Sequence, residues 1–489
     1  MSEKKAMPRD GKPTRDRVGV RGMRGWGLVA EVLLLVVVLA AGCGQGGGNL
    51  SGGNPPPPGN STVSVLITDT PPAGVTVLSF EMTITGATLN PGNVPLIASP
   101  VQVEVKHLET ETALLGTATV PSGTYNSMTL TLANAQVTIK NDTLGTLAGC
   151  SNVPPTNVCE TKPNTSGNVT IAFSTGQTIQ PNTSVGLLVD VNLNNILTAT
   201  LGVDFSAAGG FTARPATTAG GQAQLDDVLG RVATVTPVNQ QFTMDTSQGT
   251  LTVNTDSNTA FDGLSFLANG CSSGNLACLL MNQIIETDLV VRSDGSLLAT
   301  QVKLEDRDVS ESELDGTIAA VDVVNNRFTI VLLEVVPGVT GLEVGDVLTV
   351  TLAAATFDVD SDGLPVPAGL SFVNTAELLV GQRVQVRLAS VAGGSTIQAD
   401  RVRLKKAQVT AKVDTKLNAT DFTVNQLPSI FTSAGISAVE VRTSAQTSFE
   451  PSGTSVGTLA AGDMVSLGGL LFRRTVGNPV LVAGKVRKR

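Results

Sequence analysis

The chain has 489 residues, of which 41% are hydrophobic, 15% charged and only 3% aromatic, and its formal net charge is −9. This length allows several domains with packed cores, and the hydrophobic content argues against wholesale disorder. The acidic balance argues against nucleic acid as a partner. Because the chain has one His, a His-based zinc site is excluded as well.

The first 42 residues have the pattern of an export signal. Basic residues are spread over residues 1–24, and an apolar run follows at residues 32–41. That run is shorter than the roughly 20 residues that cross a bilayer, and it suits the apolar part of a signal peptide. It leads into Leu39-Ala40-Ala41-Gly42-Cys43, which resembles the lipobox of bacterial lipoproteins. The resemblance implies a signal peptide over residues 1–42 and a lipid anchor on Cys43; the alternative is an ordinary secretory signal with an incidental Cys.

Residues 43–61 are predicted to be a tether. They contain a Gly-rich stretch at 44–48 and a Pro run at 55–58. Gly-rich chain is flexible and Pro-rich chain is extended, and neither buries apolar surface. We therefore expect a folded ectodomain held to a membrane. Gly44 is not the Asp that retains many lipoproteins at the inner membrane, so the resemblance favours the outer membrane or cell surface.

The four remaining cysteines form two local pairs, Cys150 with Cys159 and Cys271 with Cys278. An even number of cysteines in an exported protein indicates disulfides. Each bond would close a short Gly-, Asn-, Pro- or Ser-rich loop. A metal site is the alternative, although no His or Cys-x-x-Cys lies nearby.

From residue 62 onward the pattern predicts successive strands and an all-β fold. Phe80, Met82 and Ile84 alternate with polar residues, which is typical of half-buried strands. The simplest arrangement for the first globular region is a β-sandwich, immunoglobulin- or transthyretin-like. Its only Tyr, Tyr125, enters a strand after Pro121-Ser122-Gly123-Thr124, so we expect its hydroxyl to bond to the backbone of that turn.

Residues 62–216 resemble a known family. The opening Val65-Leu66-Ile67-Thr68-Asp69-Thr70-Pro71, the strand at 80–89 and the turn before Tyr125 are similar to domain of unknown function 4382. That family occurs in bacterial exported proteins and lipoproteins and has no established activity. The resemblance therefore implies a location and a fold, and no chemistry.

The remainder of the chain contains three related segments: 226–309 (repeat 1), 313–406 (repeat 2) and 407–489 (repeat 3). Each has a strand that leads to a Phe-Thr pair, at Phe242, Phe328 and Phe422, and then a Thr and a second Phe at Phe261, Phe357 and Phe449. The segments resemble domain of unknown function 5666. Repeat 3 lacks the leading Gly of the other two, Gly230 and Gly316. We expect each repeat to be a small β-barrel.

A candidate metal site lies at Asp358, Asp360 and Asp362, which precede Gly363. This spacing resembles the first half of a calcium loop, although Gly369 stands where a bidentate Glu is usual. The alternative is a polar turn, because Asp-Gly is a common turn dipeptide. Calcium is the only cofactor that the sequence suggests.

No residue can be named catalytic. His107 is interpreted as a surface or strand-edge residue, and not as the base of a Ser-His-Asp triad. Paired carboxylates can serve glycoside hydrolysis, but the chain has few aromatic residues to hold a sugar. The basic C-terminus (Arg473, Arg474, Lys485, Arg487, Lys488 and Arg489) could touch acidic glycans or lipids, or be ordinary solvated strand ends.

The sequence therefore predicts a non-enzymatic, lipid-anchored protein of the bacterial cell envelope. Its β-domains would form a structural or binding array, and its partner would be an envelope protein or a surface polysaccharide. The alternatives are a carboxylate-dependent hydrolase of extracellular polymer and a calcium-stabilised adhesin. A hydrolase should show a cleft in which carboxyl groups with perturbed pKa values converge.

Overall fold

The computed structural model describes residues 59–71, 76–141, 157–163, 165–198, 200, 202–216, 224–246, 249–262, 266–267, 270–292, 296–306, 313–335, 341–389 and 395–489. The expected signal peptide, Cys43, most of the tether and Cys150 lie outside these residues. In the described part almost every regular element is a strand, so the predicted all-β class is confirmed. No helix in this part is long and apolar enough to cross a membrane.

The N-terminal domain consists of two sheets around one core. One sheet has the order β10 (Phe211–Ala216), β9 (Ser184–Asn192), β1 (Asn60–Thr70) and β5 (Ala113–Pro121). The other has the order β3 (Val94–Pro95), β2 (Thr76–Asn90), β6 (Gly123–Lys140) and β7 (Val158–Thr161), with β4 (Val101–Glu104) on β2 and β8 (Gly167–Ile179) on β6. Two short helices, η1 (Lys106–Glu109) and α1 (Leu193–Ile196), complete it.

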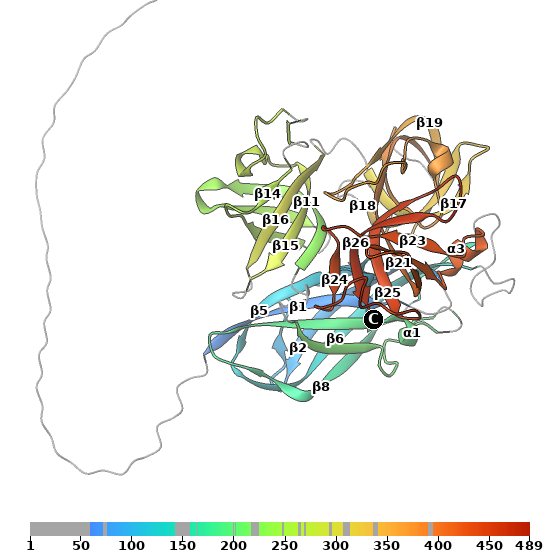
Figure 1. Ribbon diagram of the computed structural model, residues 1–489. Coiled ribbons are helices and arrows are strands. Elements are labelled where there is room, and N and C mark those ends of the chain that lie inside the picture. The colour runs from blue at the N-terminus through green and yellow to red at the C-terminus, as the bar shows by residue number, and fades with distance from the viewer. Residues whose placement is uncertain are drawn as a thin grey trace, which may run out of the picture. The chain divides into compact units, whose positions relative to one another are not determined.

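Alternating residues of β1 and β2 meet in the core between these sheets. Val65 and Ile67 of β1 are buried in the same cluster as Phe80, Met82 and Ile84 of β2. These are the positions that the period of two predicts for the apolar face. The arrangement is the predicted sandwich, and its strands run from blue to green in Figure 1.

The three repeats share one order of strand pairing. Repeat 1 contains β11 (Gln224–Thr236), η3 (Pro237–Asn239), β12 (Gln241–Thr246), β13 (Gly249–Asn254), β14 (Ala260–Phe261), η4 (Leu276–Cys278), β15 (Ile284–Val291) and β16 (Leu297–Asp306). Its pairings run β13-β12-β11-β15-β16, and β13 also pairs with β16, so the ladder returns to its start.

Repeats 2 and 3 have the same circuit of pairings. Repeat 2 contains β17 (Glu313–Asp322), β18 (Arg327–Val335), β19 (Val347–Val359), η5 (Thr375–Glu377), β20 (Arg383–Leu388) and the first half of β21 (Thr396–Lys416). Repeat 3 contains the second half of β21, then β22 (Asp421–Asn425), α3 (Ser429–Ser433), β23 (Val439–Arg442), β24 (Ser448–Glu450), β25 (Met464–Phe472) and β26 (Val480–Lys488).

The strand β21 belongs to both repeats. Lys405 is its last residue paired with β20 of repeat 2, and Lys406 is its first residue paired with β25 of repeat 3. The chain therefore passes between the two repeats without leaving the strand. This change of partners falls between Lys405 and Lys406, one residue before the predicted boundary, which stays a prediction.

The repeated sequence motifs have packing reasons. A side chain at Gly230 would place its Cβ 2.5 Å from the Met244 side chain, and one at Gly316 would lie 2.6 Å from the Val331 carbonyl oxygen. The following Phe242, Phe328 and Phe422 are all buried. The later Phe of each repeat pairs with a Val of the closing strand, at Val302, Val402 and Val486.

Candidate functional site

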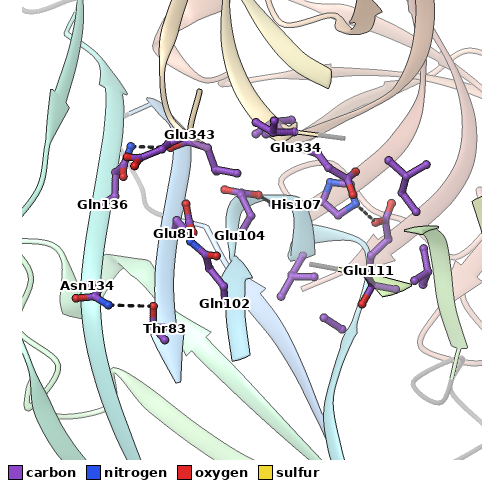
Figure 2. Close-up of a pocket in the computed structure, with 18 of the residues that line it drawn as sticks. Glu81, Thr83, Gln102, Glu104, His107, Glu111, Asn134, Gln136, Glu334 and Glu343 are labelled. Carbon is purple, nitrogen blue, oxygen red and sulfur yellow. Dashed lines mark hydrogen bonds and ion pairs between the residues drawn. The ribbon is translucent and has the colours of Figure 1, made fainter. Parts of the chain in front are cut away.

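A cavity of about 750 Å³ is lined by the outer face of β2, β4 and η1 together with residues of repeats 1 and 2. Its ionisable lining residues are mostly acidic: Glu81, Glu104, Glu111, Asp226, Glu334 and Glu343, with His107 and Lys162. The lining includes no Phe, Tyr or Trp among the described residues. We call it the Glu81 cavity, and Figure 2 shows its polar side chains.

Glu81 lies on β2, directly opposite Glu104 of β4 on one side and Gln136 of β6 on the other. Only 4% of the residue is exposed, and its Oε1 atom has no hydrogen-bond partner among the described residues. Burial raises the pKa of Glu81 to about 7, and the charges of Glu104 and Glu343 add to that rise while Lys162 opposes it. A buried carboxyl next to like charges resists ionisation.

Glu104 differs from Glu81 because backbone groups hold it. Its Oε1 accepts from the Phe80 N–H at 2.9 Å and the Lys106 N–H at 3.2 Å, and its Oε2 accepts from the His107 N–H at 2.6 Å. These bonds tie the start of η1 to β2. Burial raises the pKa of Glu104, although the Phe80 and His107 N–H groups work against that rise.

His107 lies in η1 and not at the edge of a strand, and 20% of its side chain is exposed. Its Nε2 lies 2.7 Å from Glu111 Oε2, and Gln408 Nε2 donates to Glu111 Oε1 at 3.1 Å. Burial alone would lower the pKa of His107, but the Glu111 carboxylate outweighs burial and the pKa is raised. The partner of the imidazole is thus a carboxylate, and not a hydroxyl or thiol nucleophile.

One motif that sequence reasoning misses is the Gly-x-Ser-x-Gly spacing at residues 453–457. In α/β-hydrolases this spacing forms a sharp turn between a strand and a helix. Here Ser455 lies in a loop between β24 and β25, and its N–H takes part in a local turn with Thr458 Oγ1 at 2.9 Å. The context that the motif needs is absent around Ser455.

The candidate calcium residues each face a cation. Asp358 Oδ1 lies 2.9 Å from Arg403 Nε, Asp360 Oδ2 lies 2.8 Å from Lys405 Nζ, and Asp362 Oδ2 lies 2.5 Å from Lys406 Nζ. Among the described residues, the carboxylates of Asp358, Asp360 and Asp362 do not form a group whose oxygens all lie within 4.8 Å of one another. The structure contains the tight turn that was the alternative. The Leu364 N–H donates to the Ser361 carbonyl at 2.7 Å, and Asp362 and Gly363 between them both have positive φ. Calcium binding at these residues stays a prediction.

Asp360 instead joins a second acidic group, which we call the ion network: Glu286, Glu305 and Asp360 with Lys303, Lys405 and Arg403. Lys303 Nζ lies 2.8 Å from Glu305 and 3.3 Å from Glu286, and Lys405 Nζ lies 2.7 Å from Glu286. Burial opposes ionisation of Asp360, but Lys405 and Lys303 outweigh it and lower its pKa. Carboxylates suit a hard cation by type, yet here side-chain cations already neutralise them.

The remaining predicted residues have other partners. Cys271 and Cys278 form a disulfide, and Cys159 is disulfide-bonded while its expected partner lies outside the described residues. The Tyr125 hydroxyl donates to the Pro121 carbonyl at 2.8 Å, as the turn predicts. Four of the C-terminal basic residues form ion pairs: Arg474 with Glu440, Lys485 with Asp226 and Glu450, Arg487 with Glu450, and Lys488 with Asp463.

Comparison with known proteins assigns families to two segments. Residues 60–215 match the family model "Domain of unknown function (DUF4382)". Residues 230–303 match "Domain of unknown function (DUF5666)". Both matches agree with the predicted resemblances, and the second covers repeat 1. Neither description names an activity, and no curated protein matches the chain.

A solved structure titled "drosophila Unr CSD456" aligns with 54% of this chain and 97% of its own length. The sequence identity is 11% and the TM-score is 0.13. A similarity at this level carries no argument about fold or function.

Proposed function

We propose that this is a non-enzymatic, lipid-anchored protein of the bacterial cell envelope, at the outer membrane or cell surface, whose β-domains form a binding array. The export pattern of residues 1–42, the lipobox-like sequence at Cys43 and the Gly- and Pro-rich tether support the location. The partner is an envelope protein or a surface polysaccharide. Repeated small domains on a tether give such a protein reach and several contact points.

The observation that carries the non-enzymatic proposal is the way the carboxylates of the Glu81 cavity are engaged. Glu104 accepts three backbone N–H bonds, while Glu111 pairs with His107 and Glu343 with Lys162. Glycoside hydrolysis requires two carboxyl groups free to exchange protons or attack the sugar. Glu81 takes part in none of these contacts, and its buried Oε1 has no hydrogen-bond partner among the described residues.

The shared strand β21 supports a structural role. Its residues pair first with β19 and β20 and then with β22 and β25, so repeats 2 and 3 are joined by hydrogen-bonded sheet and not by a linker. An array of this kind holds its binding surfaces in a fixed order along the chain.

One observation favours a second candidate, the carboxylate-dependent hydrolase. Glu81 has a pKa of about 7, lies in a cavity and faces Glu104, which is how a general acid is often arranged. The absence of aromatic side chains from the described lining weakens this candidate, since sugar sites usually stack their ligands on rings.

The experiment is to produce the full chain in bacteria beside two variants, Cys43→Ser and Glu81→Gln. We expect the wild-type chain in the membrane fraction, with an acylated N-terminal peptide that begins at Cys43 by mass spectrometry. Cys43→Ser should leave that fraction. Extracellular polysaccharides should release no reducing ends with either the wild type or Glu81→Gln.

Two results would contradict the proposal. An unacylated wild-type chain outside the membrane fraction would remove the anchor. Reducing ends released by the wild type and lost in Glu81→Gln would make the protein a hydrolase.

A further inference from the structure

In the Glu81 cavity two acidic residues face each other, and neither is ion-paired with a cation among the described residues. Glu81 and Glu104 stand directly opposite each other on antiparallel strands, and like charges in that relation destabilise a sheet. No ion pair of either residue is found among the described residues. The cations whose charges act on them are engaged elsewhere: Lys106 pairs with Glu109, His107 with Glu111 and Lys162 with Glu343. Glu81 is also almost wholly buried, with Oε1 unpartnered. A buried acceptor without a donor needs an explanation, and a bound cation supplies one.

The geometry argues for an organic cation and against a bare metal ion. Only Glu286, Glu305 and Asp360 bring three ligand atoms within 4.8 Å among the described residues, so the acids of this cavity do not form a metal cage. A cavity of about 750 Å³ has room for a small molecule. Part of its wall is aliphatic, with Leu114, Leu225 and Leu333.

The neighbouring amide is also oriented for a donor. Gln136 Nε2 donates to Glu160 Oε1 at 2.9 Å and to the Val344 carbonyl at 2.6 Å. These bonds engage the amide nitrogen and leave the amide oxygen to accept from another group. A primary ammonium has three donors and no acceptor, so it matches a carboxylate with a nearby amide oxygen.

We propose that the Glu81 cavity binds a molecule carrying a primary ammonium group on an aliphatic chain, with its nitrogen on the Glu81 carboxylate beside Glu104. The inference rests on the binding role proposed above and names the ligand class of that site. Two other charged groups act on Glu81: Glu343 raises its pKa and Lys162 lowers it. The aliphatic chain lies against the leucine wall.

This pairing couples binding to pH. An ammonium prefers the ionised carboxylate, and Glu81 ionises near pH 7 in the free protein. Affinity should therefore rise with pH up to about 7 and then level off, and binding should release a proton near and below that pH.

The test is titration calorimetry on the purified full chain with 1,5-diaminopentane. Pentane-1,5-diol serves as the uncharged analogue, and calcium chloride tests a metal site. We expect saturable binding of the diamine at about pH 8, about tenfold weaker binding at about pH 6, and no saturable binding of the diol or calcium. Glu81→Gln keeps the shape and removes the charge, and it should weaken diamine binding at least tenfold.

Glu440→Gln is the matched control. It removes the same charge from repeat 3, at a residue that pairs with Arg442 and Arg474 and does not line the cavity. Diamine affinity should not change in this variant.

Three outcomes would overturn the inference: no saturable diamine binding to folded protein, equal binding by wild type and Glu81→Gln, or saturable calcium binding that Glu81→Gln abolishes. Because the diamine cannot be hydrolysed and binding is measured away from cells, failure here is distinct from failure of the anchoring and hydrolysis tests.

Discussion

The ion network and the Glu81 cavity are two buried groups of carboxylates with opposite balances of charge. In the ion network, Glu286, Glu305 and Asp360 face two lysines and an arginine at hydrogen-bond distances. In the Glu81 cavity, Glu81 and Glu104 face each other. Burial opposes ionisation in both places, yet the pKa of Asp360 is lowered while that of Glu81 is raised.

The difference distinguishes structure from binding. A balanced buried network loses stability when one member is removed, since the remaining charges are left uncompensated. A group with excess negative charge should gain stability when that charge is removed, because burying an unpaired carboxylate destabilises the folded state in the absence of a ligand. The following predictions test that contrast, from the largest expected effect to the smallest.

The largest effect is expected for Lys405→Met. The substitution keeps the length of the side chain but leaves Glu286 and Asp360 without one of their cations. We expect a loss of about 3–5 kcal/mol in the free energy of unfolding, measured by urea denaturation. Lys416→Met, at a residue that donates only to the Gly457 carbonyl at an exposed site, is the control and should change stability by less than about 0.5 kcal/mol. Equal effects of the two changes would remove the contrast.

The second prediction concerns Glu81→Gln and has the opposite sign. The pKa of Glu81 is raised from 4.5 to about 7 in the folded protein, so the folded state holds this proton over a range where the unfolded state has lost it. Stability from this group is therefore lost as pH rises from about 4.5 to 7, by up to about 3 kcal/mol.

Urea denaturation of the wild type and of Glu81→Gln over that pH range measures the contribution of Glu81 ionisation, as the difference between their free energies of unfolding. The variant should match the wild type near pH 4.5 and be the more stable protein at about pH 8. A variant that is less stable at about pH 8 would show that Glu81 has a stabilising partner.

The third prediction compares two aspartates of one motif. Asp358 pairs with Arg403 where 43% of its side chain is exposed, whereas Asp360 is buried between two lysines. Asp358→Asn should therefore cost less than about 1 kcal/mol, because solvent screens an exposed pair. Asp360→Asn should cost several-fold more in the same denaturation experiment. Similar losses would mean that burial does not set the strength of this network.

The smallest effect is expected from calcium. Because Asp358, Asp360 and Asp362 each face an Arg or Lys, millimolar calcium should shift the melting temperature by less than about 1 °C. Thermal denaturation with calcium and with a chelator measures this. A rise of several degrees would favour the calcium-stabilised adhesin.

The alternation of residues predicts the strands well but cannot predict the Glu81 cavity. A period of two places Glu81 on the face of β2 opposite Phe80 and Met82, and such a face is normally solvated. Here residues more than 200 positions away in sequence contact the same sheet: Gln136 and Thr138 of β6 donate to the Val344 and Gly345 carbonyls. No local pattern encodes a contact between domains, and the pairing of Glu81 with Glu104 requires the register as well.

Repeat 3 shows a signal that sequence reasoning could have used. A turn that begins with a Leu precedes the fourth long strand of each repeat, and a Gln or Asp side chain accepts a backbone N–H within it. The bonds join Leu280 N–H to Gln283, Leu379 N–H to Gln382 and Ala460 N–H to Asp463, at 2.6–2.7 Å. This turn recurs in repeat 3, which lacks the leading Gly. The turn depends on a hydrogen bond between its own residues, whereas the Gly of the other repeats is set by close packing against the neighbouring strand.

The shared strand β21 also has a mechanical consequence. Its 21 residues serve repeat 2 at one end and repeat 3 at the other. If the chain were pulled away from its anchor, we expect that repeats 2 and 3 would not unfold one after the other. Removing β21 from one repeat also disturbs its pairing in the other. The two repeats should unfold in a single event that releases the contour length of both.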